Sequence, residues 1–281
     1  MKFINWTRLL KLNRKDKSGR RGATDAEKKA KRDETRRAED IESGYFNRYI
    51  SHLNRLKAQM DTKAAFEAAV GGDFLTVGKI ELAVLKKFGL TDHSDVVDVG
   101  CGSGRLALQL APFAAVSYVG TDVVPELLEY ARELVKRSDW RFVPTDGIKI
   151  PCGDDTADII TFFSVFTHIT HEDCYRYLKE AKRVIRPGGR ILISFLEFRI
   201  RSHWEIFHQS LLHRQPEEPM NQFMDRDGLN AWANDLGLQV VEILDGDKAH
   251  FPLEEDLQWS SGHTSSGVAS FGQSLAVLTK S

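Results

Sequence analysis

The 281-residue chain has few cysteines and no long apolar run. Cys101, Cys152 and Cys174 are odd in number and form no CxxC pair, so neither a disulfide framework nor a zinc site is indicated. No apolar stretch reaches transmembrane length, and no small-residue cleavage site follows an apolar core near the start. These absences predict a cytoplasmic protein without a bound metal.

An excess of charge of one sign is also missing, because 39 basic and 40 acidic side chains leave a formal net charge of -1. Such a balance argues against a protein that binds nucleic acid over its whole surface. The charge is nevertheless uneven, since residues 1–37 hold fourteen Lys or Arg against five Asp or Glu. A hydrophobic content of 42% is enough for the core of one domain with extensions.

The most informative run is VVDVGCGSGRL, residues 96–106. β-branched residues around an acid predict a short buried strand, and a glycine-rich turn and a helix follow. Gly100, Gly102 and Gly104 stand at positions one, three and five, with Arg105 at position six. The dinucleotide fingerprint needs glycine at position six, so a pyrophosphate ligand fits poorly. A strand, turn and helix opening a parallel sheet still predict a nucleoside-type ligand.

Two further acids follow predicted strands. Residues 116–121 predict a strand ending in Asp122, about 20 residues past the turn, where an acid reaches ribose hydroxyls. Residues 140–143 predict a third strand, which leads to Asp146. Together with Asp98, these residues predict three carboxylates along one edge of the sheet.

The strand and helix pattern continues to the end of the chain. A helix is expected over 24–60, with an apolar stripe that includes Tyr49 and Leu53. Arg186 to Gly189 should end one of the later helices with a left-handed glycine cap, and Gly237 should cap another. The other predicted strands are 158–163, 190–195, 238–244 and 273–279, and the other predicted helices are 64–70, 78–88, 171–185 and 225–236.

The glycine run and the string LKEAKRVIRPGGRILIS, residues 178–194, resemble the class I S-adenosylmethionine (SAM)-dependent methyltransferases. The resemblance covers about residues 90 to 200. It implies an α/β fold with a seven-stranded, doubly wound, Rossmann-like sheet, mostly parallel with the last strand antiparallel, and a helical N-terminal extension. It also implies SAM as cofactor, which carries a sulfonium and no phosphate, and S-adenosylhomocysteine as product.

We therefore expect three parts. Residues 1–22 form a basic tail, residues 23–90 a helical extension that closes over the cofactor as in similar enzymes, and residues 91–281 the methyltransferase domain. This domain carries an insertion at 196–223 and a long loop at 245–272. The first dozen residues are basic and amphipathic, which predicts peripheral contact with a membrane surface. The alternatives are a frayed tail or a segment that docks on a protein partner.

The resemblance implies cofactor-binding residues at the ends of the first four strands. In the resembling family, an acid at the position of Asp146 accepts a hydrogen bond from the adenine amino group. Cys101 lies within the turn, where a small packing side chain suffices. The predicted cofactor-binding residues are Asp98, Gly100, Cys101, Gly102, Gly104, Asp122, Val123, Asp146, Gly147 and Ser164.

Seven of the nine histidines fall in segments expected at the same edge of the sheet, which predicts the acceptor site there. His168 is the leading candidate for a catalytic base, because it follows the strand that borders the transferable methyl group in similar enzymes, and because histidine titrates near neutral pH. The alternative is that His168 only caps or packs the next helix. The predicted acceptor-binding residues are His171, Trp204, His208, His250 and His263.

The acceptor is predicted by exclusion. No Asn-Pro-Pro-Tyr motif of amino-methylating nucleic-acid enzymes is present, and residues 162–168 read FFSVFTH instead. We therefore expect methyl transfer to a hydroxyl of a small molecule, a sugar or a lipid-linked glycan. An RNA- or protein-directed methyltransferase that uses the basic extension, and a SAM-binding partner protein without catalysis, remain open alternatives.

Overall fold

The structure, a computed structural model, describes residues 44, 47–145, 148–212 and 219–281. The predicted basic tail and most of the predicted helix before residue 47 lie outside the described residues, and so do Asp146 and Gly147. Within the described part, residues 47–59 are helical, as the apolar stripe predicted.

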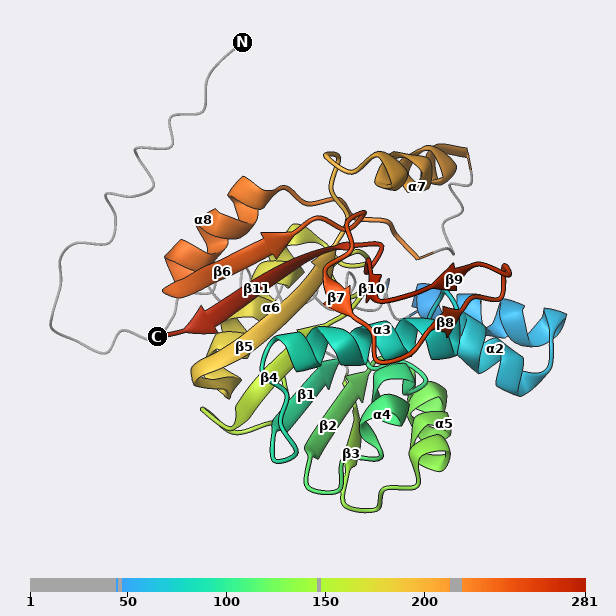
Figure 1. The fold of residues 1–281 in the computed structure, drawn as a ribbon, viewed down its shortest axis with the longest axis horizontal. Coiled ribbons are helices and arrows are strands. Elements are labelled where there is room, and N and C mark those ends of the chain that lie inside the picture. Colours follow the sequence, from blue (N-terminus) through green and yellow to red (C-terminus); the bar gives the residue numbers. More distant parts are fainter. Residues whose placement is uncertain (1–43, 45–46, 146–147, 213–218) are drawn as a thin grey trace, which may run out of the picture. The chain divides into compact units, whose positions relative to one another are not determined.

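Seven strands form one sheet in the order β3-β2-β1-β4-β5-β11-β6 (Figure 1). The first five strands in this order pair in parallel, and β11 pairs antiparallel with both β5 and β6. This arrangement confirms the predicted doubly wound sheet with an antiparallel last strand. The strands are β1 (Asp95–Val99), β2 (Ser117–Asp122), β3 (Arg141–Pro144), β4 (Ala157–Phe162), β5 (Ile185–Phe195), β6 (Leu238–Leu244) and β11 (Ser274–Lys280).

Helices cover both faces of the sheet. Successive residues of a strand point to opposite faces, so Val96 belongs to one apolar core and Val97 to the other. The Val96 core is shared with α3 (Phe74–Lys87), α4 (Arg105–Leu110) and α5 (Pro125–Val135). The Val97 core is shared with α6 (His171–Val184) and α8 (Arg226–Leu236).

Side-chain caps decide where the helices begin. Asp61 caps α2 (Thr62–Ala69), and Asp225 and Gly237 bracket α8 as predicted. Helix α3 begins four residues before its predicted start at Gly78, because the Asp73 carboxylate accepts a hydrogen bond from the Thr76 amide at 3.2 Å. Gly78 lies inside α3 and lets α4 approach closely.

The predicted glycine cap after α6 is wrong. Helix α6 ends at Val184, and Ile185 is already extended, with φ -70° and ψ 135°. Strand β5 pairs Ile185 with Ala157 and then Arg190 with Ile159, so residues 186–189 form a bulge on the side of the strand that faces β4. Gly188, with φ +80°, belongs to this bulge, because strand pairing at Ile185 takes up the chain as soon as the helix ends.

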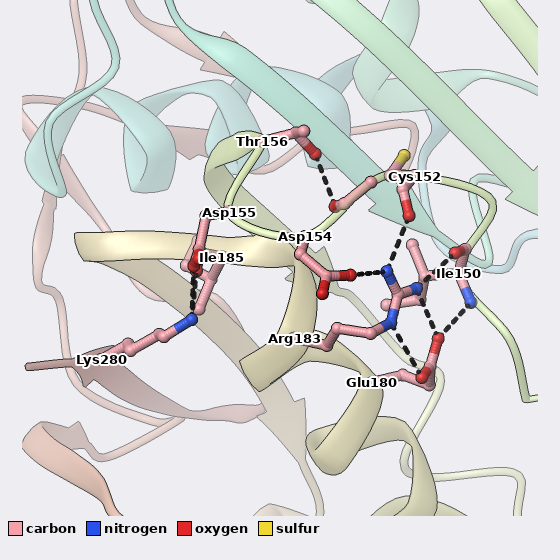
Figure 2. Close-up of polar contacts among 10 residues, drawn as sticks. Ile150, Cys152, Asp154, Asp155, Thr156, Glu180, Arg183, Ile185 and Lys280 are labelled. Atoms are coloured by element: carbon pink, nitrogen blue, oxygen red, sulfur yellow. Dashed lines mark hydrogen bonds and ion pairs between the residues drawn. The ribbon is translucent and has the colours of Figure 1, made fainter.

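The connection from β3 to β4 is held along α6 by Arg183 (Figure 2). The Arg183 guanidinium donates to the carbonyls of Ile150 and Cys152 at 3.0 and 2.8 Å, and to the Asp154 carboxylate at 2.8 Å. Glu180, one turn earlier on α6, pairs with the same guanidinium at 2.7 Å. These contacts precede the start of β4, so they stabilise the end of the sheet opposite the predicted site.

The long loop between β6 and β11 contains four short strands and lies along α3. Within it, β7 (Phe251–Pro252) pairs with β10 (Val268–Ala269), and β8 (Leu257–Gln258) pairs with β9 (Thr264–Ser265). Thr76 of α3 donates to the Gln258 carbonyl at 2.8 Å. None of the helices in the described part of the chain is long and apolar enough to span a membrane.

Candidate functional site

The glycine turn after β1 has no room for side chains at Gly100 and Gly102. Gly100 and Gly102 have φ values of +74° and +53°, which favour glycine. A Cβ on Gly100 would lie 2.4 Å from Val165 Cγ2, and one on Gly102 would lie 2.3 Å from Val70 Cγ1. The turn is therefore enclosed by Val165, which follows β4, and by Val70, which follows α2.

Asp122 ends β2 and joins the glycine turn to the next turn. Its carboxylate accepts hydrogen bonds from the backbone amides of Gly102 and Val124, both at 2.9 Å. Burial raises the pKa of Asp122, and these amide hydrogen bonds oppose the rise. A carboxylate has about four acceptor positions, so capacity remains for the hydroxyls of a ribose.

Asp98 links the strands next to the glycine turn by hydrogen bonds. It is the fourth residue of β1 and is 3% exposed, and each carboxylate oxygen accepts a hydrogen bond from a protein hydroxyl. Tyr118 donates to Oδ2 at 2.8 Å, and Thr161 donates to Oδ1 at 2.7 Å. Direct contact of Asp98 with the cofactor therefore stays a prediction, and the structure gives it a bracing role between three strands.

The remaining predicted residues of this region pack within the protein. Cys101 is buried, and burial together with the nearby Asp98 raises the pKa of its thiol well above the usual value. The thiol therefore stays protonated, in keeping with a packing role. A Cβ on Gly104 would lie 2.7 Å from the Ala131 Cβ, so this glycine lets α4 approach α5. Val123 packs in the cluster around Leu53.

Arg105, at position six of the glycine run, is bound by protein groups and is not available to bind a phosphate. Its guanidinium donates to Glu81 Oε1 through Nε at 3.0 Å, and to the carbonyls of Val70 and Gly71 at 3.2 and 2.8 Å. The pair of Arg105 and Glu81 is buried, with side chains 8% and 3% exposed. The Arg105 cation is therefore neutralised within the protein, which suits a cofactor without phosphate.

The helical segment 47–59 covers this region. Leu53 packs with Val124 and Leu127 of the turn and helix after β2, and Lys57 pairs with Glu126 at 2.6 Å. The Tyr49 ring meets the His168 ring edge-on, with the ring centroids 5.6 Å apart. Burial, and then the charge of Asp122, raise the pKa of the Tyr49 phenol. The sequence predicts Tyr49 only as part of an apolar stripe.

His168 lies on the turn that follows β4. Its Nδ1 is 2.6 Å from the Met220 carbonyl oxygen, which can only accept, so Nδ1 carries the proton. Nε2 is then the unprotonated nitrogen of the neutral ring. Burial lowers the pKa of His168, the hydrogen bond to the Met220 carbonyl opposes this change, and the nearby His52 lowers the pKa further. His168 is therefore neutral near pH 7, with a lone pair on Nε2.

The segment 219–224 lies almost entirely within the predicted insertion 196–223, which was expected at the acceptor site, but none of its residues was predicted as a site residue. It runs beside the end of β5, where Leu196 forms a parallel bridge with Phe223. The backbone amide of Gln222 donates to the backbone carbonyl of Thr167, next to His168, at 2.6 Å. No motif marks this segment in the sequence, because only the return of the chain after α7 (Arg201–Leu212) brings it here.

The predicted acceptor-binding residues lie in separate places. His171, at the start of α6, is 3.0 Å through Nε2 from the Phe223 carbonyl. Trp204 and His208 belong to an aromatic cluster on α7, with ring centroids 5.9 Å apart. The acceptor role of these three residues stays a prediction.

His250 and His263 lie in the long loop between β6 and β11. The His250 carbonyl accepts from Lys87 Nζ at 3.2 Å, at the C-terminal end of α3, and Nε2 of this ring is buried with no hydrogen-bond partner among the described residues. His263 is exposed in the hairpin of β8 and β9, where its carbonyl accepts from the Trp259 amide at 2.9 Å. The contacts of these two residues do not bring them to His168, so their acceptor role stays a prediction.

One histidine at this edge is structural. His203 is 1% exposed, its Nδ1 accepts from the Glu197 amide at 3.0 Å, and its Nε2 donates to the Gly272 carbonyl at 3.0 Å. The Glu197 carboxylate in turn pairs with Arg226 at 2.6 Å. A buried polar network therefore fixes the start of α7 to the loop before β11, and the sequence carries no spacing signal for it.

The residues of the turn fit SAM. Asp122 keeps acceptor capacity for a ribose, the nearby arginine is already paired, and the hydroxyl of Ser103 is buried in the turn without a hydrogen-bond partner among the described residues. Gly100, Gly102 and Asp122 would hold the cofactor, together with Ser164, which follows β4. When bound, SAM supplies an electrophilic methyl group.

Comparisons with known proteins agree with this geometry. Residues 97–193 match a family model described as a methyltransferase domain. The malonyl-[acyl-carrier protein] O-methyltransferase of Geobacter sulfurreducens is 28% identical over 163 residues, which cover 56% of this chain and 60% of that protein. The demethylmenaquinone methyltransferase of Deinococcus radiodurans is 36% identical over 106 residues, which cover 37% of this chain and 42% of that protein. The matched part is less than two thirds of either relative.

A solved structure shows the same fold. A chain from the complex between the Haloferax volcanii Trm112 methyltransferase activator and a methyltransferase superposes with a TM-score of 0.53 at 19% identity. The match covers 72% of this chain and 88% of that chain. This likeness shows the fold alone. The family match, together with the glycine turn and the strand order, shows that residues 97–193 lie in a methyltransferase domain of the class I SAM-dependent type, whose cofactor is SAM.

Proposed function

We propose that this protein transfers the methyl group of SAM to a hydroxyl oxygen of a small organic acceptor, with His168 as the base. The observation that carries the proposal is the tautomer of His168. The hydrogen bond from Nδ1 to the Met220 carbonyl keeps the proton on Nδ1 and leaves Nε2 free to accept a proton from an alcohol. The lowered pKa keeps the ring in this basic form near neutral pH.

The surroundings of His168 support this role. The ring lies on the turn that begins with Ser164, and Tyr49 of the helical segment 47–59 packs against its edge. Coverage by that helical segment would exclude water from the transfer, which methyl transfer from a sulfonium requires.

The names of two relatives support parts of this proposal. One is a demethylmenaquinone methyltransferase, which supports a small organic acceptor, and another is a malonyl-[acyl-carrier protein] O-methyltransferase, which supports transfer to oxygen. Sugar and lipid-linked glycan hydroxyls stay within the proposed acceptor class, because the aromatic cluster of Phe198, Trp204 and Phe207 at the end of β5 offers ring faces for stacking.

The test is to incubate the pure protein with methyl-labelled SAM and pools of small organic acids, quinols, glycans, RNA and protein. We expect label in a small-molecule or glycan pool. The variant His168→Gln should lower turnover about 100-fold or more, the usual contribution of a general base, with S-adenosylhomocysteine affinity unchanged. His93→Ala, which removes an exposed histidine beyond the opposite edge of the sheet, is the matched control and should keep full turnover.

Three results would contradict the proposal. Full turnover by His168→Gln would exclude the base role. Label found only in RNA or protein would replace the small acceptor by a macromolecule, and S-adenosylhomocysteine binding without transfer to any pool would favour a non-catalytic partner protein.

A further inference from the structure

Three polar residues form a closed ring of hydrogen bonds near the ends of β4 and β5 and the start of β11. The Ser164 amide donates to Ser194 Oγ at 2.7 Å, Ser194 Oγ donates to Gln273 Oε1 at 2.7 Å, and Gln273 Nε2 donates to Ser164 Oγ at 3.0 Å. Ser164 follows β4, Ser194 is the penultimate residue of β5, and Gln273 directly precedes β11. The ring therefore joins segments that are far apart in the sequence.

The direction of each hydrogen bond is determined by the groups available. An amide oxygen only accepts, and Ser194 is completely buried, so the Ser194 proton goes to Gln273 Oε1. With the amide reversed, the ring would offer no acceptor for that buried proton. Gln273 must then donate to Ser164 Oγ, and among the described residues no acceptor takes the proton of the Ser164 hydroxyl.

Ser164 is placed next to the cofactor turn. It is half-buried and has a φ of +59°, a conformation that non-glycine residues adopt only when their surroundings hold them. Thr167 Oγ1 donates to the Ser164 carbonyl at 2.7 Å and closes the turn. The next residue, Val165, lies against Gly100, so the unused Ser164 proton belongs to a hydroxyl beside the glycine turn.

Four backbone amides of the glycine turn already donate to protein groups and are not available to an anion. The amides of Gly100 and Cys101 donate to the Thr121 carbonyl at 2.7 and 2.9 Å, and the Gly102 amide donates to Asp122. The Gly104 amide donates to the Cys101 carbonyl at 3.0 Å. The carboxylate of the amino-acid end of SAM therefore needs a donor from outside these four amides.

We propose that Ser164 donates this hydrogen bond to the cofactor carboxylate, and that Gln273 is the positioning residue that makes it a donor. Gln273 Nε2 donates to Ser164 Oγ, so the hydroxyl proton of Ser164 must point away from the ring of hydrogen bonds. The proposal uses the SAM cofactor of the proposed function but not its acceptor, so it stands or fails by binding measurements alone.

The experiment measures dissociation constants by calorimetry for two probes. S-adenosylhomocysteine has the carboxylate, and 5′-methylthioadenosine has the same nucleoside without the amino-acid end. In Ser164→Ala, the affinity for S-adenosylhomocysteine should fall about 10-fold or more, as expected for loss of a hydrogen bond to a charged group. The affinity for 5′-methylthioadenosine should stay within about twofold, which also shows that the site is folded.

Gln273→Glu is the sharper variant. It keeps the size of the side chain but offers only acceptors, so Ser164 must turn its proton into the ring. The affinity for S-adenosylhomocysteine should fall as in Ser164→Ala, and the double variant Ser164→Ala with Gln273→Glu should be no weaker than either single variant. Gln258→Glu, the same exchange at an exposed site on β8, is the matched control and should bind both probes normally.

Each outcome decides the proposal. Selective and non-additive loss for S-adenosylhomocysteine supports it. Unchanged binding in Ser164→Ala, equal loss for both probes, or additive losses in the double variant would overturn it, since additivity would mean that Gln273→Glu acts by its charge alone. Failure of His168→Gln to lose turnover would leave these binding results untouched, so the two proposals are separable.

Discussion

At the scale of single residues, the role of a polar side chain depends on the hydrogen-bond partners of its atoms. His168 and His203 both lie near the carboxyl edge of the sheet, yet His203 has hydrogen-bond partners on both ring nitrogens. His168 has a protein partner on Nδ1 alone among the described residues. Nε2 of His168 therefore distinguishes this candidate base from the structural His203. The residue type alone could not make this distinction, since both residues are histidines.

Asp98 shows the same principle for a carboxylate. Burial raises its pKa to about 7 although the hydroxyls of Thr161 and Tyr118 oppose the rise. The folded protein therefore keeps a proton that the unfolded chain releases above about pH 4. Since the folded state binds more protons in this window, the contribution of Asp98 to stability falls as pH rises to about 7 and is then constant.

We predict that Asp98→Asn removes this dependence. The free energy of unfolding of the wild-type protein, relative to the variant, should fall between about pH 4 and pH 7 with a slope of at most about 1.4 kcal/mol per pH unit. Urea denaturation at several pH values measures the difference. Curves that stay parallel over this range would show that Asp98 titrates normally.

At the scale of elements, one buried ion pair organises the helices around the glycine turn. Arg105 of α4 pairs with Glu81 of α3 and also holds the carbonyls of Val70 and Gly71 at the end of α2. Because Val70 covers Gly102, this arginine links three helices to the cofactor turn.

We predict that Glu81→Leu destabilises the fold by about 3–5 kcal/mol, because it leaves the Arg105 charge buried and unpaired. The double variant Glu81→Leu with Arg105→Leu should be less destabilised than Glu81→Leu alone, since no buried charge remains. Urea unfolding measures both. Glu254→Gln, which breaks the exposed pair with Lys86, is the control and should cost less than about 1 kcal/mol. A double variant less stable than the single one would refute this account.

At the scale of the whole molecule, the basic charge is concentrated in a segment outside the described residues. Residues 1–22 hold eight Lys or Arg and one Asp, together with Phe3, Trp6 and several leucines. The prediction from the sequence remains that this tail contacts an anionic membrane surface.

The full chain should co-sediment with vesicles that contain phosphatidylserine, and deletion of residues 1–22 should lower partitioning about 10-fold or more, since each basic residue near such a surface contributes about 1 kcal/mol. Vesicles of phosphatidylcholine alone should bind neither form. Equal partitioning of the two forms would exclude the membrane role and leave contact with a protein partner as the alternative.

Much of the fold was predictable because local signals agreed. The buried strands are rich in β-branched residues, Asp225 and Gly237 mark the ends of α8, and the three glycines of the turn are required by positive φ and close contacts. The error after α6 arose because strand pairing at Ile185 took over from the expected glycine cap. Propensity near a chain reversal cannot show which neighbour the backbone will pair with.

Local pattern was enough to predict the buried strands, the cofactor turn and the acid at the end of β2, and the resemblance to the methyltransferase family supplied the doubly wound sheet. The pairing of polar atoms, in contrast, came from contacts between distant segments. Met220 selects the tautomer of His168, Gln273 orients the Ser164 hydroxyl, and Glu81 neutralises Arg105. These partners are 24 to 109 residues apart, and hydrogen bonds over such separations leave no period or spacing in a sequence.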